Sequence, residues 1–259
     1  MITIPDSALH FGFDNGPGGP HASRTMMLSE LRALLDACPP SAAYKQYSAA
    51  VVAQNVLLKR TETTRRESLR RLRELYGLSR SMVIFRALRD LWDEAPAEQP
   101  SLALLAALAR DPLLRATAKP VIDARPGDPV SAGMLAEAVT EQFSDRLNPM
   151  SRASISRHAA STWTQAGHLQ GRSHKVRAAL ARGPAAVTYA LFLGYLCGAR
   201  GAALFETFWA RITDAATAEL HEQAFVAARL GWLEYRRVGD VTEVRFSYLL
   251  RGEEGATGE

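Results

Sequence analysis

The chain has 259 residues, of which 47% are hydrophobic and 22% charged, and its formal net charge is +4. This composition is typical of a globular protein with one large or two modest domains, and it excludes an intrinsically disordered chain. The net charge is too small to indicate a partner by itself. Cys38 and Cys197 lie in apolar helical patterns, which predicts buried free thiols in a reducing cytoplasm. The sequence has no CxxC or HExxH motif, so we expect neither a metal nor another cofactor.

The first third of the chain predicts a basic helical part that follows an irregular arm. Residues 1–22 are rich in Gly and Pro, lack the pattern of a signal peptide and are assigned no secondary structure. Residues 23–95 form the expected N-terminal part, and its apolar spacing predicts helices over 23–37, 42–58, 61–77 and 79–92. Ser23 and Thr61 are the expected N-caps of the first and third of these helices. The acidic, proline-bearing segment 93–100 is the expected linker.

Residues 101–250 predict a C-terminal helical part, followed by a frayed tail over 251–259. Helices are expected over 101–111, from the Asp111-Pro112 pair, from Ser131 to Phe143, and over 151–166, 185–197, 202–212 and 214–230. A weak strand over 176–180 and a hairpin that turns at Gly239-Asp240 complete the prediction. The uncharged run 183–199 barely reaches the length of a membrane span, so we expect a buried core helix there, with a transmembrane helix as the alternative.

Cationic residues are unevenly distributed along the chain. From Arg146 through Phe205 there are eight Arg or Lys residues and no Asp or Glu. Within this window the order of elements is helix, break, helix, glycine and short basic segment, which is the order of a winged helix-turn-helix. We therefore expect Ser154, Arg157, Ser161 and Gln165 to face bases, and Arg152, Arg172, Lys175 and Arg177 to meet phosphates. The alternative is a packed three-helix unit with a solvated basic face.

A second basic region precedes this window. From Lys59 to Arg89 there are ten basic residues against Glu62, Glu67 and Glu74. Phosphate contacts are expected from a first island that comprises Lys59, Arg60, Arg65, Arg66, Arg70, Arg71 and Arg73. Helical spacing also allows several of these arginines to pair with the glutamates, which would leave an ordinary solvated face.

Two further regions give weaker signals. The expected helix and hairpin over 214–248 repeat the winged order, but Glu219 and Glu222 make that helix less basic, so dimerisation or a scaffold role is at least as favoured there as DNA contact. His158, His168 and His174 lie close together in the sequence without a nearby acid or a nucleophile motif, so we do not expect an enzyme.

Two segments carry a family resemblance. MMLSELRALLDACPP at 26–40, followed by AAVVAQNVLLKRTETTRRESLRRLRELYGL at 49–78, resembles the BrxA family of bacteriophage-exclusion (BREX) defence systems. The family's box appears as Asn55 to Thr61, with Leu58 where we expect glutamine, and SRHAASTWTQAGHLQG at 156–171 is similar to the family's small-residue helix. The resemblance implies a cytoplasmic, mostly helical, non-enzymatic protein that binds DNA beside a methyltransferase and ATPases. The family has been compared with the RNA-binding antitermination factor NusB, so the resemblance also implies RNA as an alternative partner.

Together these observations predict a mainly α, compact multi-helix protein with winged-helix-like elements and a small C-terminal β hairpin. The expected function is duplex DNA binding in a BREX-type phage-defence system, without a membrane partner. The alternatives are a scaffold subunit that docks other phage-defence subunits and an RNA-binding, NusB-like factor.

Overall fold

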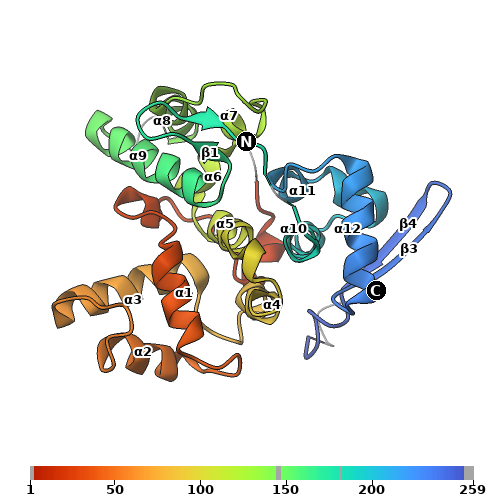
Figure 1. Cartoon of the computed structure of the whole chain (residues 1–259), viewed down its shortest axis with the longest axis horizontal. Coiled ribbons are helices and arrows are strands. Elements are labelled where there is room, and N and C mark those ends of the chain that lie inside the picture. The colour runs from red at the N-terminus through yellow and green to blue at the C-terminus, as the bar shows by residue number, and fades with distance from the viewer. Residues whose placement is uncertain (1–2, 144–146, 181, 254–259) are drawn as a thin grey trace.

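The computed structural model describes residues 3–143, 147–180 and 182–253, and helices dominate them (Figure 1). Helix α5 (Gln99–Arg110) is the central element, since every side chain from Leu102 to Ala109 is buried. It contacts α3, α4, α9 and α10, which come from both ends of the chain. Such all-round burial is expected of a helix that is apolar on every face.

The chain before α5 forms a helical layer that packs on it. Its elements are the 3-10 helices η1 (Asp6–Phe11) and η2 (Pro20–Ala22), then α1 (Leu28–Asp36), α2 (Tyr44–Val52), α3 (Glu62–Tyr76), α4 (Val83–Trp92) and the 3-10 helix η3 (Pro96–Glu98). The segment expected to be an irregular arm instead buries Ile4, Ala8 and Phe13 in the main core. Buried contacts of this kind tie a chain terminus down.

Two predicted helix starts and ends in this layer are wrong for local reasons. Ser23 does not cap the first helix, because Met27 takes a left-handed conformation with φ 54° and α1 begins only at Leu28. The second helix ends at Val52 because Asn55 and Leu58 also have positive φ, and the Asn55 Oδ1 accepts the Lys59 N–H at 2.9 Å. Asn tolerates this conformation better than most residues. Thr61 does cap α3, since its side chain accepts the Thr64 N–H.

The chain after α5 forms two successive units. The first contains α6 (Pro112–Ala116), α7 (Ala118–Ile122), α8 (Ala132–Phe143), α9 (Pro149–Gln165), β1 (Leu169–Gln170) and β2 (Val176–Arg177). The second contains α10 (Pro184–Leu196), the 3-10 helix η4 (Gly201–Glu206), α11 (Phe208–Ile212), α12 (Thr217–Arg229), β3 (Glu234–Val238) and β4 (Val241–Arg245). The hairpin predicted around Gly239-Asp240 is confirmed, with Val238 opposite Val241 in antiparallel register.

Three predicted elements in these two units differ from the structure in their bounds or caps. The helix expected over 202–212 is divided into η4 and α11, because Thr207 has an extended backbone and caps α11 through the Ala210 N–H. Asp214, the expected cap of the last helix, instead has φ 60° and lies before α12. The strand expected over 176–180 is shorter, because only Val176 and Arg177 pair with β1.

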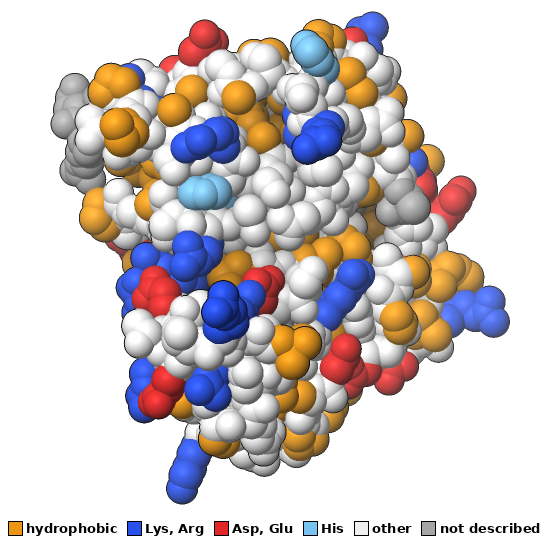
Figure 2. Space-filling model, turned by 60° about the vertical axis from the view of Figure 1, so that its left-hand side comes forward, with side chains coloured by type: hydrophobic (Ala, Val, Ile, Leu, Met, Phe, Trp, Pro, Cys, Tyr) orange, Lys and Arg blue, Asp and Glu red, His pale blue; other side chains and the backbone are white. Residues whose placement is uncertain are grey.

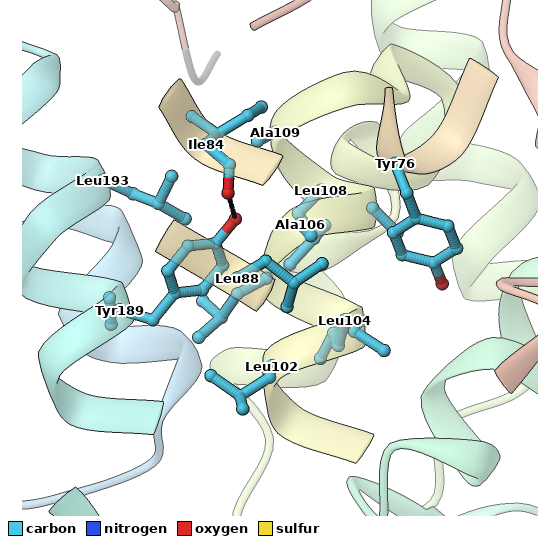
Figure 3. Close-up of a cluster of buried hydrophobic side chains, with 14 of the residues drawn as sticks. Tyr76, Ile84, Leu88, Leu102, Leu104, Ala106, Leu108, Ala109, Tyr189 and Leu193 are labelled. Carbon is cyan, nitrogen blue, oxygen red and sulfur yellow. Dashed lines mark hydrogen bonds between the residues drawn. The ribbon is translucent and has the colours of Figure 1, made fainter. Parts of the chain in front are cut away.

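One continuous cluster of buried hydrophobic side chains joins the two predicted parts of the chain. Figure 3 shows its centre, where α4, α5 and α10 meet and the Tyr189 hydroxyl donates to the Ile84 carbonyl at 2.9 Å. The segment 93–100 is packed here as well, since the Glu98 carboxylate accepts the Ala186 N–H at 2.7 Å at the start of α10. The run 183–199 is therefore a core helix, and no helix in the described ranges has the length and apolar character to cross a membrane.

Candidate nucleic-acid interface

Helices α8 and α9 and the β1–β2 hairpin follow one another in the chain order expected of a winged helix-turn-helix, and α8 packs against α9 (Figure 1). Ser131 caps α8 by accepting the Met134 N–H, and Asn148 caps α9 by accepting the Ser151 N–H at 2.8 Å. Pro149 occupies the first turn of α9, where its missing N–H costs nothing. Pro129 forms a single antiparallel bridge with Val176 beside the two-stranded hairpin. These local signals determine where α8 and α9 begin.

The inner face of α9 holds it on the fold. Ile155, Ala159 and Trp163 are fully buried, and the Trp163 indole N–H donates to the Thr117 hydroxyl at 2.9 Å. A separate small core of Leu113, Ala116, Val139, Phe143 and Ile155 joins α6, α8 and α9. Trp163 therefore anchors the helix as expected, and the opposite face points outward.

A groove of about 550 Å³ runs between α9, the β1–β2 hairpin and the start of α8; we call it the α9 groove. Its polar and charged lining includes Ser131, Arg157, Ser161, Arg172, His174 and Lys175, and no acidic residue of the described chain lines it. Arg157 and Arg172 are exposed, and the Lys175 ammonium donates to the Gly171 carbonyl. In the residues that the structure describes, these three cations have no carboxylate partner, so their charge is available to an anion.

The other residues predicted to contact DNA differ in where they lie. Ser161 and Gln165 both line the α9 groove, and the Gln165 amide donates to the Ser161 hydroxyl at 3.2 Å. The side-chain carbonyl of Gln165 also accepts the Leu28 N–H at 3.4 Å. Ser154 is half-buried in the first half of α9. Arg152 lies on the α8 side of the helix, where its guanidinium donates to the Thr140 hydroxyl at 3.2 Å. The structure thus brings Arg157, Ser161, Gln165, Arg172 and Lys175 together around the groove and leaves Arg152 apart.

Arg177 is not a surface residue, contrary to the expectation from its place in the basic segment. Its side chain is 1% exposed and forms an ion pair with Asp214 at 2.7 Å. It also donates to the carbonyls of Val121 and His168. A buried guanidinium with this set of acceptors is a structural group that joins the two C-terminal units, and no phosphate can reach it.

The first island is partly neutralised, since four glutamates pair with four of its seven cations. The pairs are Lys59–Glu30, Arg66–Glu62, Arg70–Glu67, Arg70–Glu74, Arg71–Glu67 and Arg71–Glu74. Hydrogen bonds from Arg70 hold the pKa of Glu67 at about 2, so this carboxylate stays ionised at neutral pH. Arg65 donates to the Val52 carbonyl, and Arg73 lies over the Tyr44 ring. Arg60 is exposed, and the structure gives it no acidic partner within the described ranges.

Figure 2 shows the side of the molecule with α9 above and α3 below. In the lower half, cationic and acidic side chains alternate, in agreement with the pairs along α3. The upper half has separate cationic side chains and histidines on a largely neutral surface. On this side of the molecule, Arg157, Arg172 and Lys175 around α9 therefore differ from the paired arginines of α3 in having no carboxylate partner in the described residues.

A buried hydrogen-bonded chain beside this site was not expected from the sequence. His21 Nδ1 lies 2.7 Å from Asp111 Oδ2, and His21 Nε2 lies 2.7 Å from the Thr162 hydroxyl oxygen. All three side chains are 0% exposed, so the order of an acid, a histidine and a hydroxyl does not make a catalytic site here. Instead it fastens the N-terminal segment to α6 and α9. Only the helix cap at Asp111 had a local sequence signal.

The remaining histidines are dispersed. His168 is buried, and its Nε2 lies 2.8 Å from the Ile212 carbonyl oxygen; burial is the main cause that lowers its pKa to about 4. His158 Nδ1 lies 3.0 Å from the His21 carbonyl oxygen, whereas His174 is exposed in the α9 groove. Among the residues described, no group of three or more His, Cys, Asp or Glu is placed to hold a metal ion. Cys38 and Cys197 are free thiols.

A comparison with protein-family models finds no match to this chain. A comparison with curated proteins finds none either.

Proposed function

We propose that this protein binds duplex DNA through the α9 groove, with α9 in the major groove and the β1–β2 hairpin along the backbone. The observation that carries the proposal is the set of Arg157, Arg172 and Lys175 around one groove without a carboxylate. Phosphate binding requires clustered cations of this kind, and a protruding helix with small polar side chains is able to enter the groove of B-form DNA. The hydroxyl groups of Ser154 and Ser161 are short enough to let the helix approach the bases.

The proposal assigns different roles to the two basic regions. The α9 groove supplies the cations that displace counterions from DNA. Arg60 and Arg73 are exposed first-island residues without a carboxylate partner in the described ranges, and they are able to add contacts. The paired arginines of α3 contribute little, because each must break its ion pair with a glutamate before it is able to bind a phosphate. A non-enzymatic role in a BREX-type defence system in the cytoplasm rests on the sequence resemblance alone, and so does the presence of other defence subunits as partners.

The test is a fluorescence-anisotropy titration with a duplex of about 20 base pairs at one fixed salt concentration. A variant with Arg157→Gln, Arg172→Gln and Lys175→Gln is expected to bind about tenfold or more weakly than the parent protein. The matched control is Arg66→Gln, Arg70→Gln and Arg71→Gln, which removes the same charge from α3 and is expected to keep most of the affinity. Equal losses in both variants would contradict the assignment of the groove.

RNA binding is separated in the same experiment. Unlabelled single-stranded and double-stranded RNA of equal length compete with the labelled DNA duplex, and the proposal expects them to compete more weakly than unlabelled DNA duplex. A-form RNA has a narrow major groove that α9 cannot enter. If either RNA competed more strongly than the unlabelled DNA duplex, RNA and not DNA would be the ligand of the α9 groove.

A further inference from the structure

Helix α12 has an unusual distribution of side chains. Its inner face buries Leu220, Ala224 and Ala227 against the fold. Its outer face exposes larger apolar residues: Phe225 is 58% exposed, Val226 40% and Leu230 53%. Scattered apolar side chains are ordinary on a surface, but a group of three on one helix face marks an interaction site.

Two charges accompany this apolar group on the same face. At 100° per residue, Glu222 and Arg229 lie in the middle of the exposed arc, with Phe225 on one side and Val226 and Leu230 on the other. The two charges are seven residues apart, roughly 10 Å along the axis, so they cannot pair with each other. In the described parts of the chain, neither has an ion-pair partner.

We propose that this face binds a second copy of the chain, with the two α12 helices antiparallel about a twofold axis between Phe225 and Val226. Such an axis places Glu222 opposite Arg229 of the other copy, and the same pair forms again on the other side of the axis. It also places Phe225 against Val226 of the other copy twice. A twofold contact must be self-complementary, and the spacing of these four residues meets that requirement.

The alternative occupant for this helix is DNA, because α12 precedes the β3–β4 hairpin in the order of a second winged unit. Its outer face is poorly suited to that ligand, since it presents Glu222 and three apolar side chains. In Figure 1, α12 and α9 lie on opposite sides of the molecule. A dimer through α12 therefore leaves both α9 grooves open, and the inference does not depend on what those grooves bind.

The interface is small, with one helix from each copy at its centre. We expect a dissociation constant of about 1 to 100 µM, which is typical of weak, transient interfaces. Sedimentation equilibrium of the full chain over this concentration range measures it directly. A monomer throughout the range would overturn the proposal.

Charge reversal tests the predicted register. Glu222→Arg places two arginines opposite each other at both ends of the interface, and Arg229→Glu places two glutamates there, so each variant alone is expected to dimerise at least about tenfold more weakly. Mixing the two variants in equal amounts restores both opposite-charge pairs, and the mixture is expected to form heterodimers with nearly the parent affinity. Both positions are exposed, and the circular dichroism spectrum and melting temperature of each variant confirm that it folds.

Two controls complete the design. Phe225→Ser is expected to weaken the dimer, whereas Arg236→Glu on β3, an exposed charge reversal outside the patch, is expected to leave it unchanged. A dimer that tolerates Glu222→Arg, Arg229→Glu and Phe225→Ser, or a mixture of the two charge variants that stays monomeric, would overturn the α12 register.

Discussion

Arg177 provides the sharpest contrast between a cation that holds the fold and one that is free to bind a ligand. We predict that Arg177→Met strongly destabilises the protein, although methionine keeps most of the side-chain volume. The substitution leaves Asp214 without its 2.7 Å partner and removes the donors to the carbonyls of Val121 and His168. Arg182 lies 3.6 Å from Asp214 and compensates in part.

The expected magnitude follows from these contacts. Breaking a buried ion pair by removing one partner typically costs about 3 to 5 kcal/mol. Asp214 keeps 22% of its side-chain surface exposed and regains some hydration, so we expect the lower end, about 3 kcal/mol. Arg157→Met is the matched control, because this side chain is exposed and, within the described ranges, its side-chain hydrogen bond is to the Ala153 carbonyl of its own helix. A surface change of this kind alters stability by about 0.5 kcal/mol or less.

Urea unfolding followed by circular dichroism measures both variants, and unchanged slopes with a lower midpoint for Arg177→Met would indicate a loss of stability. Anisotropy with a DNA duplex, at a temperature where both variants are folded, gives the second readout. The structural role of Arg177 would be refuted if Arg177→Met unfolded like the parent protein and lost as much DNA affinity as Arg157→Met.

Three further predictions concern stability. Burial lowers the pKa of His168 to about 4 in the folded protein, below its ordinary value of 6.5, so the stability that its neutral form contributes is present above pH 6.5 and is lost as the pH falls toward 4. A shift of this size corresponds to about 3 kcal/mol, and the urea midpoint of His168→Gln should therefore fall less between pH 7 and pH 4 than that of the parent. Gly77→Ala should cost about 1 to 3 kcal/mol in the same assay, because φ is +86° at Gly77 and a Cβ there meets the Met82 side chain; an unchanged midpoint would contradict the strain. Arg66→Gln should leave the midpoint unchanged, because its pair with Glu62 is exposed to solvent, and a clear loss would show that the first island stabilises the fold.

The order of α8, α9 and the β1–β2 hairpin was predictable because its signals are local. Ser131 and Asn148-Pro149 start α8 and α9, Gly167 ends α9 with φ +86°, and the stripe of Ile155 and Trp163 fixes which face is buried. The C-terminal hairpin was predictable for the same reason, since two β-rich runs flank a short turn. Each of these features depends on residues within one or two turns of chain.

The N-terminal segment and the role of Arg177 were not predictable, because distant residues decide them. His21 contacts Asp111, 90 residues away, and the Met26 N–H donates to the Thr162 hydroxyl, 136 residues away. Arg177 lies in a basic stretch, but its partner Asp214 is in the next unit. The sequence shows how many cations each region contains. Which of those cations lack a carboxylate partner depends on contacts that form only in the folded chain.

The salt dependence of duplex binding tests the central claim most directly. Each phosphate contact contributes about 0.9 to the slope of the logarithm of the association constant against the logarithm of salt concentration. The parent protein is therefore expected to have a slope steeper by about 2.7 than the variant with Arg157→Gln, Arg172→Gln and Lys175→Gln, if all three cations contact phosphates. Parallel lines for the two proteins would contradict the assignment of DNA binding to the α9 groove.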